Sequence, residues 1–287
     1  MRDRLRTALS FRRFAALTTV TTLTLVSLGV YTAATGSGLA CSAQWPLCDG
    51  GVLPQTVPSF IEWFHRLVAM VTGVLIVGLA AWAWRTGESR LRRPAILAAV
   101  LLPLQVSVGA VTVTIGGLVP GGYSPPTQAA HLFVALAIFT ALALTTLRAY
   151  DGQVAEAPIA RARRALPTAL AVLLVAAVLS RLVPLYPYTP AAQAAFVGVS
   201  LALYATLLAA GRWLAAADRP AARLLVAVGV VATLVGLGLG RDLVFYTPTV
   251  RLVNAAVFAA GFVAVALAVW RVRDDAGSGA VLRVTGD

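Results

Sequence analysis

Charged residues are scarce in this sequence of 287 amino acids: they make up 12% of it, whereas hydrophobic residues make up 59%. Soluble globular domains carry about 25% charged and about 45–50% apolar residues. The composition therefore excludes a water-soluble enzyme, and it excludes a disordered chain, which would be poor in apolar residues. The sequence also lacks a glycine-rich phosphate loop, a nucleophile elbow and an HExxH zinc motif. What remains is a protein that lies in a membrane.

Lysine is absent, so all 23 basic residues are arginines, and they outnumber the 11 acidic residues to give a net charge of +12. An excess of this kind can indicate nucleic-acid binding. In a hydrophobic chain, however, arginines mark the cytoplasmic ends of membrane spans. We therefore expect no nucleic-acid partner and interpret the arginines as markers of membrane topology.

Long apolar stretches recur along the chain, each of about 20 residues, which is the length that a helix needs to cross a bilayer. We expect an all-α, polytopic membrane protein with eight transmembrane helices. The stretches lie at roughly 14–34, 62–84, 94–116, 127–147, 165–183, 190–211, 221–240 and 248–270.

Arginines gather on one side of these expected spans. All but four of them fall in the N-terminal segment, in the loops after the second, fourth and sixth spans, or in the C-terminal tail. The positive-inside rule places that side, with both termini, in the cytoplasm. We expect a multi-pass protein of the plasma membrane. The four arginines elsewhere are Arg66, Arg181, Arg241 and Arg251, for which extension to the membrane interface is the ordinary role.

The fourth and eighth spans begin in a similar way. The fourth opens with Pro125 and reaches His131, and the eighth opens with Pro248 and reaches Asn254, at the same offset along the sequence. Both halves would start in the cytoplasm, so the similarity predicts two parallel four-helix halves, related by a pseudo-twofold axis along the membrane normal. The expected halves are residues 1–150 and residues 151–287, and the second half has no histidine.

The two histidines of the chain, His65 and His131, both lie near the outer ends of their spans. Each is about five residues into its helix, which is roughly 7–8 Å below the outer boundary at 1.5 Å per residue. Two histidines at one depth can ligate a haem iron from opposite faces of the ring. The alternative is two unrelated polar side chains bonded to the backbone. Ionisable residues inside membranes are functional candidates, so the pattern allows both interpretations of the two histidines.

Glu62 and Arg66 flank His65. Glu62 precedes the histidine by three residues and shares its helix face. It can face the same cavity and move protons or stabilise a cationic intermediate, or it can simply be solvated or paired with Arg66. Arg66 in turn can bind a haem propionate through a charge-assisted hydrogen bond, or extend to the interface.

The two cysteines, Cys41 and Cys48, fall in the outer loop between the first and second spans. The outside of the cell is oxidising, so a disulfide is expected. It can serve as a structural staple of the loop or as a redox-active pair near the haem edge. Two cysteines are too few for an all-cysteine metal site.

Taken together, these motifs resemble the heme A synthase family. The resemblance covers the first four spans closely, and over the last four it depends on the number of spans and on the repeat. It rests on Thr35-Gly36-Ser37-Gly38-Leu39-Ala40-Cys41, Trp45-Pro46-Leu47-Cys48, Glu62-Trp63-Phe64-His65-Arg66 and Thr127-Gln128-Ala129-Ala130-His131, in that order.

The resemblance implies a membrane oxidoreductase that converts heme O to heme A by successive oxidation of a ring methyl to a formyl group. It implies that His65 and His131 are axial ligands of the substrate haem iron, near the outer face of the membrane. Glu62 would then be the catalytic carboxylate, and Cys41 and Cys48 would form the outer disulfide. Heme O is the implied substrate, and heme O synthase and assembly factors of the terminal oxidase are the implied partners.

The second half departs from the family pattern. The family has a second histidine pair there that holds a heme b, whereas this chain has Asn254 in the eighth span and, by a looser correspondence, Gln193 in the sixth. We therefore expect a one-haem variant of the enzyme. The alternatives are a non-catalytic haem-binding carrier or assembly protein for terminal oxidases, and a transporter without haem. The sequence leaves the oligomeric state open.

Overall fold

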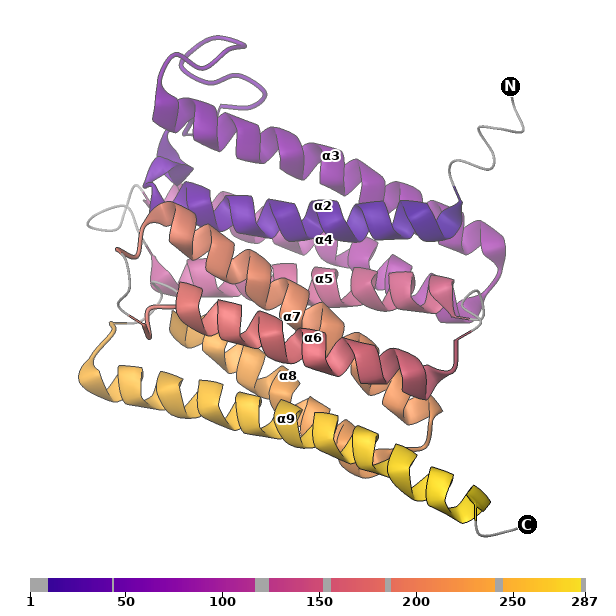
Figure 1. Ribbon diagram of the computed structural model, residues 1–287. Coiled ribbons are helices and arrows are strands. Elements are labelled where there is room, and N and C mark those ends of the chain that lie inside the picture. Colours follow the sequence, from indigo (N-terminus) through magenta and orange to yellow (C-terminus); the bar gives the residue numbers. More distant parts are fainter. Residues whose placement is uncertain are drawn as a thin grey trace. The chain divides into compact units, whose positions relative to one another are not determined.

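The computed structural model describes residues 10–42, 44–116, 124–151, 156–183, 187–240 and 245–284, with side chains as far as residue 274. Within these ranges the chain is helical and has no β-strand. The long helices are α2 (Phe11–Ala34), α3 (Val57–Thr86), α4 (Ser89–Gly116), α5 (Pro125–Tyr150), α6 (Pro158–Leu179), α7 (Pro190–Ala216), α8 (Pro220–Gly240) and α9 (Pro248–Val284) (Figure 1).

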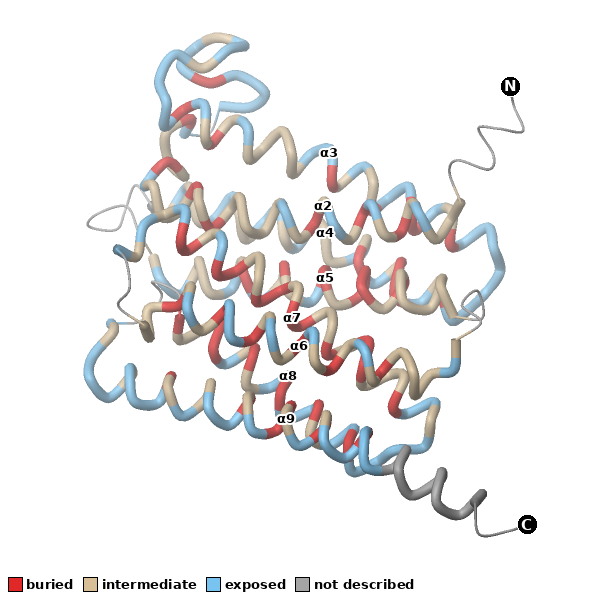
Figure 2. Tube along the Cα trace, viewed as in Figure 1, coloured by how far each residue is buried: buried red, intermediate tan, exposed pale blue. Residues whose placement is uncertain are grey.

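All eight of these helices are long and apolar enough to cross a membrane. The prediction of an all-α, polytopic protein with eight spans is therefore confirmed. Most of the apolar side chains along α3 are exposed or half-buried (Figure 2), as expected for a helix that faces lipid. Among the arginines noted above, Arg241 lies outside the described residues.

Helix starts follow from proline placement. Five helices, α5 to α9, begin with a proline, whose fixed φ suits the first helical turn and whose missing N–H is not needed there. The start of α3 differs from the expected span: it begins at Val57, earlier than residue 62. The reason is a polar cap, because the Thr56 side chain accepts a hydrogen bond from the Ser59 N–H. Glu62 therefore lies within the helix and not at its edge.

The chain forms two compact units, Met1–Val154 with Thr189–Ala194, and Ala155–Tyr188 with Ala195–Asp287. In the first unit, α2 and α4 each pack against both α3 and α5. The four helices thus close a ring in which α3 and α5 lie diagonally across the interior. An apolar cluster fills the part of the ring near the start of α2; it consists of Ala15, Ile76, Leu79, Ala98, Ile138, Ala141 and Leu142.

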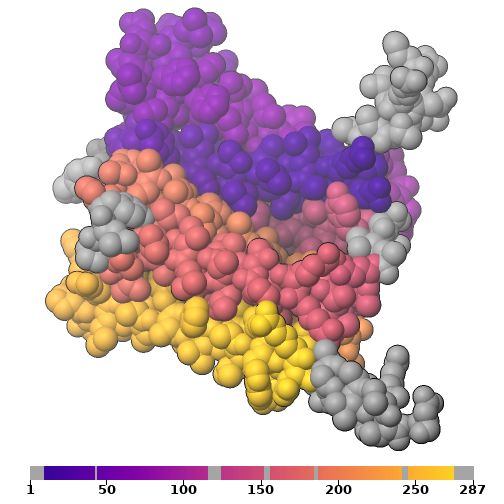
Figure 3. All heavy atoms as spheres, viewed as in Figure 1, coloured from indigo at the N-terminus to yellow at the C-terminus, as the bar shows by residue number. Residues whose placement is uncertain are grey.

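The opposite end of the first unit, where α2 ends and α3 and α5 begin, is called the loop end here. The loop of residues 35–56 joins α2 to α3 there and, with the start of α3, forms a projecting lobe (Figures 1 and 3). No residue of the apolar cluster lies close to this end. The histidines predicted to form a site lie at the loop end, on the two diagonal helices.

In the second unit, α9 packs against α6 and α8. These pairings correspond to those of α5 with α2 and with α4 in the first unit, and the four-plus-four repeat stays a prediction. The core of the second unit draws on all four of its helices, with buried residues such as Leu166, Leu207, Val226 and Val265.

Candidate functional site

The loop at the loop end is closed by a disulfide between Cys41 and Cys48, as predicted. The Cys48 N–H donates to the Gly51 carbonyl at 2.9 Å, and the Gly51 N–H donates back to the Cys48 carbonyl at 3.0 Å. The turn between them needs positive φ at Asp49 (54°) and Gly50 (77°), a conformation that glycine adopts without strain. Cys48 therefore sits in a tight, defined turn, to which the disulfide joins Cys41.

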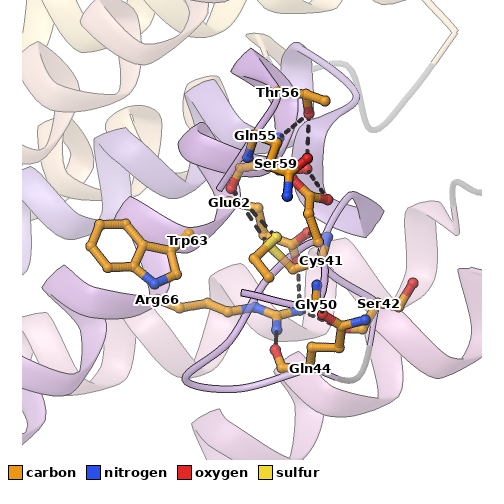
Figure 4. The surroundings of a disulfide bond; sticks show 12 residues. Cys41, Ser42, Gln44, Gly50, Gln55, Thr56, Ser59, Glu62, Trp63 and Arg66 are labelled. Atoms are coloured by element: carbon orange, nitrogen blue, oxygen red, sulfur yellow. Dashed lines mark hydrogen bonds and ion pairs between the residues drawn. A yellow bond between two sulfur atoms is a disulfide. The ribbon is translucent and has the colours of Figure 1, made fainter. Parts of the chain in front are cut away.

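A buried carboxylate ties this loop to α3. Glu62 is only 2% exposed. Its Oε2 accepts a hydrogen bond of 2.5 Å from the Cys41 N–H, and its Oε1 accepts one from the Arg66 guanidinium. Arg66 also donates to the carbonyls of Ser42 and Gln44, at 2.8 and 2.7 Å (Figure 4). Glu62 and Arg66, one turn apart on α3, thus clamp the start of the loop against the helix.

This clamp settles what Glu62 and Arg66 contact, which the sequence left open. The pairing of the two side chains is present, and the Arg66 guanidinium is engaged by the loop backbone as well. The contact with Cys41 was not foreseen, because a backbone N–H leaves no mark on the sequence pattern. Removing one partner of a buried ion pair leaves the other uncompensated, at a cost of about 3–5 kcal/mol.

Asp49 is a second anchor of the loop that the sequence reasoning missed. Its Oδ2 accepts from the Gln55 N–H at 2.8 Å, and its Oδ1 accepts from the Ser59 hydroxyl at 2.9 Å. These hydrogen bonds, the one from Gln55 first, hold the pKa of Asp49 below its ordinary value of 3.8. In the sequence, this anchor could have been predicted from the carboxylate directly after Cys48 and from the serine in the first turn of the next helix.

The structure places the two histidines in the same unit and near the same end of it. His65 lies about two turns into α3 and His131 about two turns into α5, so they occupy the diagonal helices at the same end of the ring. The two imidazoles are close enough to interact electrostatically. A third side chain joins them: the Gln105 Nε2 of α4 lies 3.2 Å from the His131 Nε2.

The available side chains suit a haem iron better than a metal ion that the protein must bind by itself. Among the described residues, no group of three or more histidine, cysteine, aspartate or glutamate side chains could hold a metal ion unaided. A haem iron needs only two axial ligands from the protein. The Nδ1 of His65 is buried and has no hydrogen-bond partner in the described part of the chain, so it is available as a donor. Two imidazoles on diagonal helices, near the same end of one unit, are a ligand set that a haem could use.

The second unit does not fit a haem. At the position corresponding to His131, Asn254 is fully buried and donates to the Tyr246 hydroxyl at 3.0 Å. Phe196 packs against Gly240 so closely that a Cβ there would lie 2.5 Å from the phenyl ring. The cavity between the four helices, lined in part by Phe258, has a volume of about 10 Å³, which is room for about one water molecule.

These features define a multi-pass membrane protein with a two-histidine site at one end of a four-helix unit. Residues 55–183 match the COX15-CtaA family, described as cytochrome oxidase assembly protein. The heme A synthase of Bacillus licheniformis is 36% identical over 138 residues, which are 47% of this chain and 44% of that protein. The heme A synthase of Geobacillus kaustophilus is 34% identical over 146 residues, 50% of this chain and 44% of that one.

The protoheme IX farnesyltransferase of Halobacterium salinarum is 35% identical over 154 residues, 53% of this chain and 32% of that protein. The matches show that part of the chain is similar to the COX15-CtaA family and to proteins named heme A synthase, which is the resemblance that the sequence motifs indicated. The chain spans less than half the length of these curated relatives.

Proposed function

We propose that this protein is a membrane oxidoreductase that converts heme O to heme A by oxidising one ring methyl to a formyl group. The observation that carries the proposal is the placement of His65 and His131 on diagonal helices of one unit, beside the buried Glu62. The similarity to proteins named heme A synthase supports it. Similarity to a protein named for farnesyl transfer to protoheme IX supports a haem as the molecule that is handled.

In this proposal His65 and His131 bind the substrate as axial ligands of its iron. Gln105 lies within hydrogen-bond distance of the Nε2 of His131, and it would orient the ring by accepting the Nε2–H through its amide oxygen, which leaves the other ring nitrogen for the iron. A ring methyl of the substrate would be hydroxylated twice to a hydrated aldehyde; each step adds one oxygen atom and passes two electrons and two protons to an external oxidant that the protein does not itself hold. Loss of water then gives the formyl group.

Glu62 is proposed as the carboxylate that holds a proton or stabilises positive charge near the ring. It stands one turn before His65 on α3. Arg66 and the Cys41 N–H hold its two oxygens in place. The disulfide loop covers Glu62, because this side chain is 2% exposed. The loop would thereby exclude water from the carboxylate, which strengthens its electrostatic effect.

We propose further that the protein lies in the plasma membrane with both termini in the cytoplasm, so that the loop end faces outward. The arginine asymmetry supports this orientation. The proposed partners are heme O synthase, which would deliver the substrate, and assembly factors of the terminal oxidase, which would receive the product.

The test is a haem extraction. The chain is expressed in a host that supplies heme O and makes no heme A, and the pigments are separated by chromatography and identified by mass. Heme A or its hydroxylated precursor is the expected product. Heme O or heme b bound unchanged would favour a carrier that serves oxidase assembly. The absence of any haem would overturn both functions and favour a transporter.

A further inference from the structure

Each histidine of the site faces a glycine on a neighbouring helix. A Cβ placed on Gly29 of α2 would lie 3.0 Å from the Cε1 of His65. A Cβ placed on Gly109 of α4 would lie 3.1 Å from the Cε1 of His131. Real Cβ atoms rarely approach a neighbour so closely, so a side chain at either glycine would push on the imidazole.

The two contacts have the same geometry. In both, Cε1 is the nearest ring atom, and the two ring nitrogens lie farther away, at 3.7 Å each for His65 and at 3.7 and 3.8 Å for His131. In both contacts, therefore, the imidazole points at the glycine with its Cε1 corner, which lies between the two ring nitrogens. The match arises on two separate helix pairs, α2 with α3 and α4 with α5, so local sequence does not impose it.

Other glycines within the described ranges show that this is no general feature of glycine in these helices. A Cβ on Gly73 of α3 would meet nothing within 4 Å. In the second unit, a Cβ on Gly229 would lie 2.9 Å from an apolar side chain, Val265, and a Cβ on Gly238 would meet nothing within 4 Å. Among the described glycines, only Gly29 and Gly109 have an imidazole as the nearest neighbour of the added Cβ.

We propose that Gly29 and Gly109 are positioning residues, each of which sets where one axial imidazole lies and how its plane is turned. The inference rests on the proposed haem site. Axial ligation needs a ring nitrogen at a fixed distance from the iron, so a displacement of a few tenths of an ångström weakens the bond or rotates the ring. Groups that orient a metal ligand typically change metal affinity by roughly 10–100-fold when altered.

The two glycines differ in how easily the histidine that each one contacts can turn. His131 is held on a second side by Gln105 at 3.2 Å, whereas no side chain among the described residues makes such a contact with the ring of His65. His65 can therefore turn away from an added methyl group more easily than His131 can. Gly109→Ala should have the larger effect of the two substitutions.

The experiment compares Gly29→Ala and Gly109→Ala with two controls in the full-length protein. Gly73→Ala adds the same methyl group to a helix of the site, in open space. Gly229→Ala adds it against Val265, so it reports crowding between helices without an imidazole. The readouts are the ratio of Soret to protein absorbance, the affinity for added haem, and the low-spin ferric signal in electron paramagnetic resonance.

The expected result is roughly tenfold weaker haem binding, a shifted low-spin signal, or both, for the two site variants, with Gly109→Ala the stronger. Both controls should keep the wild-type signal, even if Gly229→Ala lowers the melting temperature. If a site variant fails to fold, Gly29→Ala in a His65→Ala background removes the clash and should fold. Unchanged spectra and affinity in both site variants would overturn this inference and leave the proposed function standing. A wild-type protein without haem would overturn the proposed function and this inference with it.

Discussion

The Oε2 of Glu62 accepts a 2.5 Å hydrogen bond from the backbone N–H of Cys41, so a side chain of α3 is tied to the first half-cystine of the loop. A backbone donor cannot rotate away as a side chain can, so the carboxylate stays in place only while the loop stays closed. His65 follows Glu62 within one turn of the same helix. Loop closure, carboxylate position and histidine position are thereby linked through α3.

Replacing Glu62 should separate catalysis from binding. Glu62→Ala is expected to retain haem, because the histidines remain, and to stop formation of the formyl group. Chromatography of extracted haem measures the product, and the Soret band measures retention. Glu88→Ala, in an exposed pair with Arg90, is the matched control and should behave as wild type. Normal amounts of heme A in Glu62→Ala would remove the role proposed for this residue.

Replacing the histidines should affect binding itself. His65→Ala and His131→Ala should each lose the low-spin signal of a haem with two axial imidazoles, and the double variant should bind little haem. Asn254→Ala, which removes a buried side chain of the second unit, serves as control for general destabilisation. A double histidine variant with a wild-type Soret band would show that the haem lies elsewhere.

The second unit should contribute no haem, so purified protein should contain about one haem per chain. Phe196 and Phe258 occupy the space against Gly240 and Gly236, and no histidine is present there. Asn254→His alone should not raise the ratio, because it supplies a ligand without room for a ring. The ratio is measured by the pyridine haemochrome assay against amino-acid analysis. Two haems per chain would contradict the packing argument.

Removing the disulfide should loosen the loop. Cross-linking a loop this short stabilises a protein by about 2–3 kcal/mol in the chain-entropy model, so Cys41→Ser with Cys48→Ser should lower the melting temperature. We expect heme A formation per bound haem to fall as well, since the Cys41 N–H is then less well held against Glu62. Dithiothreitol treatment of the wild type should reproduce both effects. An unchanged product yield would show that closure of the loop does not affect the function proposed for Glu62.

The loop should open in acid through Asp49. Its folded pKa is held below 3.8 by hydrogen bonds from Gln55 and Ser59, so the stabilisation is present above pH 3.8 and is lost as pH falls through the lower, folded value. Hydrogen exchange of residues 44–56, corrected for intrinsic rates, should show protection persisting at pH 4 and declining below it. Asp49→Asn should abolish this dependence. A decline centred above pH 5 would point to another group.

Much of the fold could be read from composition. A bilayer needs long apolar helices whose backbone groups bond internally, so hydropathy alone placed all eight. The placement of His65 and His131 in the first turns of their helices also followed from sequence, and their equal depth in the membrane stays a prediction. The disulfide followed from the number of cysteines and their predicted outer location.

Only the tertiary structure decided which residues meet. Glu62 with the Cys41 N–H, His65 with Gly29, and Phe196 with Gly240 are contacts between helices or between a helix and a loop. In a membrane protein such contacts depend on how each helix is rotated against its neighbours, and apolar sequence is nearly uniform around the helix. Hydropathy therefore determined the number of the spans, whereas packing determined which side chains meet, such as each histidine with its glycine in the first unit and Phe196 with Gly240 in the second.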